Sequence, residues 1–302
     1  VVSYDNPYDI YSTSADYGLA SEGAGSEKTY FSQNLCVADD VNIGNDTTDS
    51  QVAEGAGTFN LATNTVTYAQ NIYEKLYPAS TTKILTAYIA LKYGNLEDYV
   101  TVSENAADQA SDSSVCGLKA GDVVQLKDLL YGMMLKSGND AAIAIAEHIG
   151  GSVEGFADMM NQEALAMGAT RSHFVNPNGL PDENHYTSVY DLYLIFQNAV
   201  QDQTFLDIIS TMSYDVVYTD VNGAGVEKTW ENTNQYLTGK EKAPEGITVV
   251  GGKTGTTSMA GSNLILYSKN SNGNSYISVV MHASDSFSLY SQMSHLLELE
   301  NQ

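Results

Sequence analysis

The chain has 302 residues, and its 37 acidic and 13 basic side chains give a formal net charge of −24. This charge excludes a protein that binds nucleic acid or docks on an anionic membrane, because both need a cationic surface. Hydrophobic residues make up 43% of the chain, which is enough to build a core. No stretch has the ~18 apolar residues of a membrane span.

The N-terminal residues 1–32 are predicted to form a flexible tail, because Ser, Tyr, Gly and acidic residues alternate there without a hydrophobic period. The opening VVSYDNPYDI has no Met, no basic region and no apolar signal-peptide core. We therefore expect a mature or trimmed chain. An acidic, Lys-poor surface suits an exported protein, so an extracytoplasmic location is expected. A single folded domain is expected over residues 33–302.

The first folded elements are predicted from residue 33 onward. An edge strand is expected around Cys36, and the stretch VAEGAGTFNLATNTVTYAQ predicts two strands around an Asn-containing turn. A helix is predicted after Pro78, with Ser80 able to cap it and Gly94 ending it. This helix is apolar on nearly every side, so we expect it to be buried.

The middle of the chain, roughly residues 100–211, is predicted to be a helical insertion. Apolar residues recur at helical spacing between 121 and 168, with interruptions at KSGND and at Gly150-Gly151. Ser152 is expected to cap the third of these helices, and two shorter helices are expected over 186–210.

The hydrophobic period changes to two after residue 212. SYDVVYTDV, ITVVGG, NLILYS and SYISVVMHA are predicted strands, with Asn-Gly turns at 222–223 and 272–273. A last helix over roughly 286–299 is expected to pack on the sheet. Strands at both chain ends with helices between them indicate a mixed α/β (α+β) fold, in which the two ends share one sheet.

One candidate nucleophile stands out in Ser80-Thr81-Thr82-Lys83, the only Ser-x-x-Lys of the chain. Residues three apart share a helix face, so Lys83 Nζ can reach Ser80 Oγ. A serine needs a base to become a nucleophile, and a lysine becomes that base only when burial or a nearby cation lowers its pKa. A surface Lys following a capping Ser is the alternative interpretation.

Two further motifs support the catalytic interpretation. Ser137-Gly138-Asn139 lies in the break between two predicted helices, where side chains can project into a cleft. Lys253-Thr254-Gly255 follows ITVVGG at a glycine-rich strand edge, along which a peptide could add as a strand while Lys253 and Thr254 hold an anionic end. Similar triplets occur elsewhere in the chain, but none has this placement.

Taken in this order, Ser-x-x-Lys, Ser-x-Asn and Lys-Thr-Gly resemble the signature of penicillin-binding proteins and serine β-lactamases. The stretches YPASTTK, GLKAGDVVQLKDLLYGMMLKSGNDAA, HFVNPNGL, HYTSVYDL and GGKTGTTSMAG resemble the low-molecular-mass D-alanyl-D-alanine carboxypeptidases. The resemblance covers roughly residues 51–300. It implies a transpeptidase/β-lactamase-like fold: an antiparallel sheet flanked by helices, with an inserted helical subdomain.

The resemblance also implies a role for each motif residue. Ser80 would be acylated by the penultimate D-Ala carbonyl of a peptidoglycan stem peptide, with Lys83 as general base. Ser137 would pass the proton to the leaving D-Ala, and Asn139 would orient the substrate amide. Lys253 and Thr254 would bind the terminal carboxylate, and the backbone N–H groups of Ser80 and Thr256, the residue after Gly255, would form the oxyanion hole. β-Lactams would be covalent inhibitors, and no cofactor is implied.

The chain departs from the family pattern at one position of the third motif. Many carboxypeptidases of this kind have a bulkier residue where Thr256 stands, which leaves the choice of acceptor open. Family members often continue into a second β-rich domain and a membrane anchor, and neither is expected in this chain. The five His show no metal-binding spacing, so no metal site is expected.

Two other functions remain open. A β-lactamase would need a deacylating Glu in a Glu-x-x-x-Asn loop, and neither Glu154, Glu163 nor Glu183 fits that pattern. A catalytically silent wall-binding or β-lactam-sensing protein would not need all the motif residues together. Cys36 and Cys116 could form one disulfide bond or remain two buried thiols.

Overall fold

The computed structural model describes residues 34–44 and 53–301. The chain divides into two units, residues 1–33 and residues 34–302, and the description below concerns the second alone. The tail predicted over residues 1–32 lies outside the described residues. No helix in the described part of the chain is long and apolar enough to cross a membrane.

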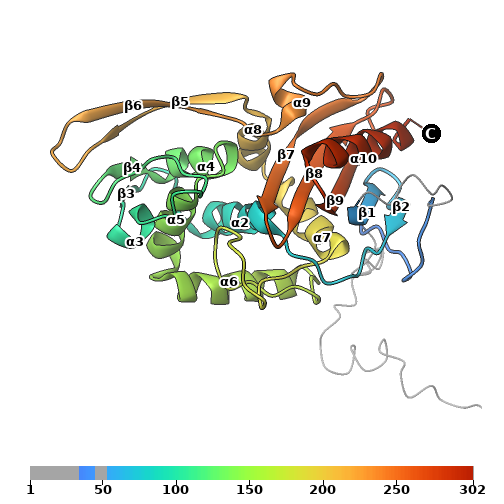
Figure 1. The fold of residues 1–302 in the computed structure, drawn as a ribbon, viewed down its shortest axis with the longest axis horizontal. Helices are drawn as coiled ribbons and strands as arrows, with labels where there is room; N and C mark the ends of the chain where they lie inside the picture. Colours follow the sequence, from blue (N-terminus) through green and yellow to red (C-terminus); the bar gives the residue numbers. More distant parts are fainter. Residues whose placement is uncertain (1–33, 45–52, 302) are drawn as a thin grey trace, which may run out of the picture. The chain divides into compact units, whose positions relative to one another are not determined.

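The main sheet joins the two ends of the described chain (Figure 1). Its five antiparallel strands lie in the order β2-β1-β9-β8-β7. The strands are β1 (Ala53–Asn60), β2 (Thr65–Gln70), β7 (Thr248–Thr257), β8 (Gly261–Lys269) and β9 (Ser275–Ala283). The predicted α/β class, the antiparallel sheet and the shared use of both chain ends are confirmed. β7 is an edge strand, and it carries the Lys-Thr-Gly motif.

Each face of this sheet packs against helices. Alternate residues of β8 and β9 point to opposite faces, as the strand period of two requires. On one face Leu264, Leu266 and Val280 pack with the apolar side of α10 (Ser286–Leu299). On the other face Ile265 and Ile277 join the larger core with α7 (Val189–Ala199). The expectation that the last helix packs on the sheet is confirmed (Figure 1).

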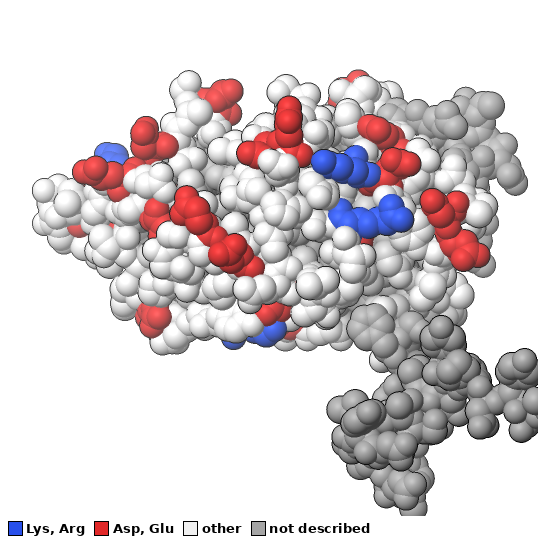
Figure 2. All heavy atoms as spheres, turned by 90° about the horizontal axis from the view of Figure 1, so that it is seen from below, with Lys and Arg blue, Asp and Glu red and all other residues white. Residues whose placement is uncertain are grey.

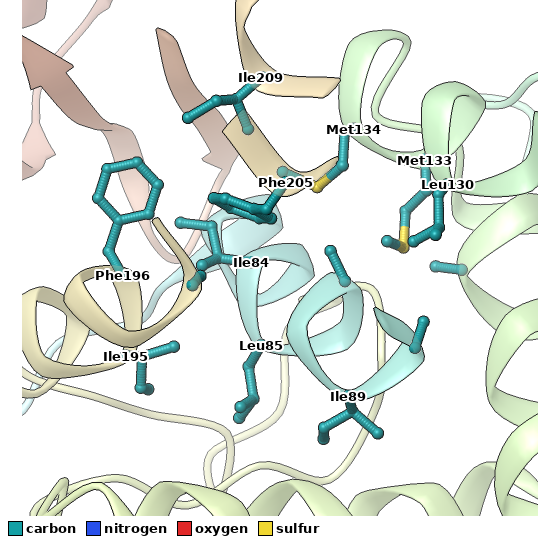
Figure 3. Packing of buried hydrophobic residues seen from close by; sticks show 14 of the residues in the cluster. Ile84, Leu85, Ile89, Leu130, Met133, Met134, Ile195, Phe196, Phe205 and Ile209 are labelled. Carbon is teal, nitrogen blue, oxygen red and sulfur yellow. The ribbon is translucent and has the colours of Figure 1, made fainter. Parts of the chain in front are cut away.

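The helical layer surrounds α2 (Lys83–Tyr93), the buried helix predicted after Pro78. It contacts α4 (Leu126–Leu135), α5 (Asn139–Gly150), α6 (Val153–Ala166), α7 and α8 (Gln203–Ser210). Ile84, Leu85 and Ile89 of α2 pack among side chains of α4, α7 and α8 (Figure 3). Because helices enclose α2, its first turn is held rigidly. Ser152 caps α6 as predicted, with its side chain accepting from Gly155 N.

A second, four-stranded sheet was not predicted. Its order is β3-β4-β5-β6, with β3 (Tyr99–Thr101), β4 (Val123–Gln125), β5 (Ser213–Thr219) and β6 (Gly225–Glu231). β3 and β4 lie in the segment expected to be helical, together with the short helix α3 (Glu104–Ala107). β5 and β6 form the hairpin expected at Asn222-Gly223, but this hairpin pairs with β4 instead of the main sheet and packs on α4 (Figure 1).

The edge strand predicted around Cys36 is wrong. The backbone N–H of Cys36 donates to Tyr193 Oη at 2.9 Å, and its carbonyl accepts from Tyr190 Oη at 2.8 Å. Side chains of α7 therefore satisfy the polar groups that a strand would use in a ladder. Among the described residues before β1, only Ile43 pairs with the sheet, through an isolated bridge to Ala69 of β2.

The two cysteines are separate buried thiols. Cys36 Sγ donates to Asn60 O at 3.4 Å, whereas Cys116 lies against Gly132 and Gly138, near the Ser-x-Asn motif. The structure therefore contradicts a disulfide bond between Cys36 and Cys116 and agrees with the alternative of two thiols.

Candidate active site

Ser80 lies in η2 (Ala79–Thr82), a 3₁₀ turn that leads directly into α2. Residues three apart eclipse one another in a 3₁₀ turn, so Ser80 and Lys83 share a face. Ser80 makes no capping hydrogen bond to the helix backbone, and the prediction that it caps the helix is wrong. Its Oγ instead accepts a hydrogen bond from Lys83 Nζ at 2.9 Å. The hydroxyl is thus bonded to the lysine and not to the helix backbone.

Lys83 is completely buried, and three oxygen atoms contact its Nζ. Besides Ser80 Oγ, these are Asn139 Oδ1 at 2.8 Å and the backbone carbonyl of Asn178 at 2.7 Å. Burial holds the pKa of Lys83 well below its ordinary value, and the positive charge of Lys253 lowers it further. An amine with a depressed pKa is able to accept a proton at neutral pH.

The second motif lies at the junction of α4 and α5, as predicted. Ser137 has a left-handed φ of 62°, which is uncommon for a residue with a side chain and which turns the backbone between the two helices. The next position, Gly138, has no room for a side chain, because a Cβ there would lie 2.3 Å from Cys116 Sγ. Asn139 is the first residue of α5, and its backbone N–H donates to Ser114 O at 2.8 Å.

Lys253 lies on β7 and contacts the second motif. Its Nζ donates to Ser137 Oγ at 3.0 Å and to Thr254 O at 2.9 Å. The side chain is buried, and burial lowers the pKa of Lys253 to about 7. A Cβ on Gly255 would lie 2.8 Å from Ser80 N, so this glycine lets β7 approach η2 closely. The two lysines and two serines are therefore close neighbours.

Two cavities meet at Ser80, and both also include Ser114 and Thr256. The first, which we call the acyl-side cavity, has a volume of about 290 Å³ and further includes Asp112, Ser113, Asn139, Asn178, Gly179, Leu180, Pro181, Thr257 and Ser258. The second, which we call the carboxylate-side cavity, has a volume of about 260 Å³ and further includes Ser137, Thr233, Gln235, Thr254, Gly255, Ser262, Ser286, Leu289 and Tyr290. Lys253 lies behind this lining and is not part of it.

The segment 175–180 completes the surroundings of Lys83, a role that the sequence motifs do not indicate. Pro177 O accepts from Thr86 Oγ1 at 2.7 Å, next to the contact from Asn178 O to Lys83. Gly179 has a φ of +84°, and a Cβ there would lie 1.8 Å from Ala79 O. The only sequence signal for this contact is the Asn-Gly pair within HFVNPNGL.

His185 ties this segment to the first motif. Val175 N donates to His185 Nδ1 at 3.1 Å, so Nε2 carries the proton and donates to Thr82 Oγ1 at 2.8 Å. Burial lowers the pKa of His185 to about 4, which keeps the ring neutral. Among the residues that the structure describes, no group of three or more His, Cys, Asp or Glu could hold a metal ion.

Comparison with solved structures defines the class of protein to which this fold belongs. The Streptomyces K15 DD-transpeptidase superposes with a TM-score of 0.76 at 29% identity, over 82% of this chain and 97% of that one. A putative penicillin-binding protein homolog from Mycobacterium tuberculosis superposes with a TM-score of 0.72 at 25% identity, over 82% of this chain and 90% of the other. The chain has the fold of the DD-transpeptidases, as the sequence motifs predicted.

Sequence comparisons then define the family. The D-alanyl-D-alanine carboxypeptidase DacA of Haemophilus influenzae is 36% identical over 70% of this chain and 52% of its own length. DacF of Bacillus subtilis is 36% identical over 58% of this chain and 45% of its own length, and the Streptomyces K15 carboxypeptidase is 32% identical over 68% and 72%. A family profile for D-alanyl-D-alanine carboxypeptidases matches residues 45–285. The chain belongs to this family, peptidase family S11, and spans about half the length of the first two relatives.

Proposed function

We propose that this protein is a serine-type D-alanyl-D-alanine carboxypeptidase, which removes the terminal D-Ala from peptidoglycan stem peptides through an acyl-enzyme on Ser80. The observation that carries the proposal is the set of three contacts to Lys83 Nζ, from Ser80 Oγ, Asn139 Oδ1 and Asn178 O. Membership of the family supports the same substrate.

The three contacts direct the lone pair of a neutral Lys83 toward Ser80. An amide oxygen and a backbone carbonyl can only accept hydrogen bonds, so Asn139 and Asn178 take the two N–H groups of a neutral amine. The remaining partner, Ser80 Oγ, accepts an N–H from a charged Lys83 and donates its own proton once the amine is neutral. Neutral Lys83 is therefore oriented to accept the Ser80 proton as general base.

In acylation, Ser80 Oγ bonds to the carbonyl carbon of the penultimate D-Ala while its proton moves to Lys83. The C–N bond then breaks, and the proton reaches the leaving D-Ala nitrogen through Ser137, whose Oγ is held by Lys253. The backbone N–H groups of Ser80 and Thr256 would stabilise the oxyanion. The close approach of β7 to η2 at Gly255 supports this pairing.

Deacylation reverses the proton flow. A water molecule enters the space that D-Ala leaves, gives a proton to Lys83 and adds to the acyl carbon, and Ser80 Oγ departs with that proton. The products are free D-Ala and a shortened peptide with a new carboxylate. Asn139 would orient the substrate amide during both steps.

The terminal carboxylate of the substrate would lie in the carboxylate-side cavity. Thr254 and Thr256 offer hydroxyl donors there, and Thr233 Oγ1 lies 2.6 Å from Thr254 Oγ1. Lys253 would act through its nearby positive charge, because it lies behind the lining. With a net charge of −24, the protein repels an anionic peptide at long range, so recognition must be local.

The proposal includes an extracytoplasmic location, where peptidoglycan and penicillin are met. A β-lactamase is not favoured, because no Glu lines either cavity at Ser80. Glu163, one of the three candidates, is engaged by Lys92 at 2.7 Å and by Tyr93.

The direct test is release of D-Ala from diacetyl-L-Lys-D-Ala-D-Ala. The protein should release one D-Ala per peptide, and Ser80→Ala should release none above background. Ser103→Ala removes a helix-capping serine away from both cavities and is the matched control. Absence of D-Ala release by the folded protein would contradict the proposed function.

A further inference from the structure

The two cavities at Ser80 take opposite parts of the substrate proposed above. The D-Ala carboxylate lies in the carboxylate-side cavity, next to Thr254, and the scissile carbonyl lies at Ser80. The peptide that precedes the scissile bond must then extend into the acyl-side cavity. The lining of that cavity therefore decides which residue is accepted before the D-Ala-D-Ala end.

The acyl-side cavity has one charged side chain in its lining, Asp112. The other lining residues are neutral, and Leu180 and Pro181 add apolar surface. Asp112 is exposed, and its side chain has no hydrogen bond or ion pair with any residue that the structure describes. A carboxylate with no protein partner, beside apolar surface, is suited to an aliphatic side chain that ends in a cation.

The loop that carries Asp112 is anchored to the second motif. Asp140, next to Asn139, accepts hydrogen bonds from the backbone N–H groups of Cys116, Gly117 and Leu118 at 2.9, 2.8 and 3.0 Å. Ser114 O accepts from Asn139 N, and Ser113 N donates to Ala110 O at 2.9 Å. The segment that directly follows Asp112 is thus held next to the proposed catalytic residues, which keeps this carboxylate near the cavity that it lines.

We propose that Asp112 selects stem peptides in which the residue before D-Ala-D-Ala carries a free ammonium group at the end of an aliphatic side chain. This inference rests on the proposed function. The aliphatic part would lie against Leu180 and Pro181, and the ammonium would pair with the Asp112 carboxylate. A side chain that ends in a carboxylate would be disfavoured, because like charges repel.

The experiment compares two peptides that differ only in this charge. One is Nα-acetyl-L-Lys-D-Ala-D-Ala, with a free ε-ammonium, and the other is its Nε-acetylated form, in which that charge is absent. kcat/KM for D-Ala release is measured for both with the unaltered protein, Asp112→Asn and Asp108→Asn. Asp108 lies shortly before Asp112 in the sequence and is also exposed, but it lines neither cavity. Asp108→Asn therefore changes the net charge by the same amount as Asp112→Asn without altering the lining.

The unaltered protein and Asp108→Asn should prefer the free-amine peptide by about three- to five-fold at low salt, the scale of an exposed ion pair. Asp112→Asn should reduce this ratio to about one, and Asp112→Lys should favour an Nε-succinylated peptide. If the unaltered protein hydrolysed both peptides with equal kcat/KM, or if the preference persisted in Asp112→Asn, the inference would be overturned. The proposed carboxypeptidase function would still stand. Failure to release D-Ala from either peptide would overturn both.

Discussion

At the scale of single residues, the proposed acylation of Ser80 depends on the protonation of Lys83. Its Nζ contacts two oxygen atoms that can only accept hydrogen bonds and one hydroxyl, within a site that excludes water from the lysine. Burial and the charge of Lys253 both favour the neutral amine. In the proposed mechanism, the same surroundings therefore set both the base strength and the orientation of Lys83.

Lys83→Arg should abolish most acylation, because a guanidinium keeps a positive charge but does not deprotonate in proteins. Loss of the general base should lower the rate of penicillin acylation by about 10²–10⁴-fold. Lys92→Arg on the same helix, where Lys92 pairs with Glu163, is the control and should acylate normally. Rapid acylation of Lys83→Arg, measured by stopped-flow or quenched mass spectrometry, would remove Lys83 from its assigned role.

The pH dependence of kcat/KM should have two limbs. On the acid side activity falls, because Lys83 becomes protonated and no longer accepts the Ser80 proton. On the alkaline side activity should fall near the pKa of Lys253, which burial lowers to about 7, as the charge facing the substrate carboxylate is lost. The two lysines interact, so the measured values belong to the pair.

Lys253→Arg keeps its charge at all relevant pH values and should lose the alkaline limb, whatever its absolute rate. A C-terminally amidated peptide should weaken the same limb in the unaltered protein. An alkaline limb that is unchanged in both experiments would show that Lys253 does not titrate as described.

The side chains proposed to be catalytic could be selected from the sequence because the proposed chemistry depends on residue type and on short spacings such as Ser80 to Lys83. Asn178 could not, since it acts through its backbone carbonyl, which every residue has. Capping by Ser80 was predicted wrongly because the 3₁₀ turn directs its hydroxyl to Lys83. A pattern of residue types cannot separate these two local geometries.

At the scale of elements, the segment 175–180 is a structural support for the first motif. Gly179 packs its backbone onto Ala79, and Asn178 O contacts Lys83. His185 connects Val175, the first residue of the segment, to Thr82. Displacement of this segment should therefore move both Ser80 and Lys83 from their positions.

Gly179→Ala should destabilise the fold and slow acylation, because the added Cβ would lie 1.8 Å from Ala79 O at a φ of +84°. Gly273→Ala is the matched control: its φ of +80° carries the same backbone strain, but a Cβ there meets nothing within 4 Å. Urea unfolding should show about 1 kcal/mol lost in the control and about 1–3 kcal/mol more in Gly179→Ala.

Penicillin acylation of Gly179→Ala should also fall, by up to about 10²-fold, because Ser80 is displaced. Gly273→Ala should acylate at the unaltered rate. Equal behaviour of the two variants in both assays would mean that the segment does not hold the first motif in place.

The long helices and the strands of the main sheet could be predicted because each presents several turns or alternations of apolar residues. β3 and β4 could not, because each has three residues, too few to establish a period of two. The hairpin β5–β6 was predictable from its Asn-Gly turn, but its partner β4 was not. Local sequence specifies a hairpin, whereas the choice of sheet depends on tertiary packing.

At the scale of the whole molecule, acidic side chains outnumber basic ones, and Figure 2 shows more Asp and Glu than Lys and Arg on the face that it displays. Two buried titratable groups far apart in the sequence have opposite effects on stability. Burial lowers the pKa of His185 to about 4 and raises the pKa of Glu300 to about 7. Glu300 accepts hydrogen bonds from Ser268 and Ser278 beneath α10.

For His185, the unfolded chain binds the proton more tightly, so the free energy of unfolding rises by about 3 kcal/mol from pH 4 to 6.5. For Glu300, the folded chain binds the proton more tightly, so the free energy of unfolding falls by about 3 kcal/mol from pH 4.5 to 7. The two effects nearly cancel in the unaltered protein.

Single substitutions should separate these effects in urea unfolding measured from pH 4 to 7. Relative to the unaltered protein, the stability of Glu300→Gln should increase with pH by about 3 kcal/mol, and that of His185→Gln should decrease by a similar amount. Curves for both variants that run parallel to the unaltered protein would contradict the assignment of these two groups.

In the proposed mechanism, penicillin acylates Ser80, and no carboxylate base hydrolyses the penicilloyl adduct quickly. A penicillin leaving group stays attached through its ring and blocks the approach of water, whereas D-Ala departs. Intact-mass analysis after exposure to penicillin should show an increase of one penicillin, located on Ser80 by peptide mapping and absent in Ser80→Ala. The adduct should persist for minutes or longer, which corresponds to a deacylation barrier of at least about 20 kcal/mol. Rapid, repeated hydrolysis of penicillin without an adduct would contradict the account.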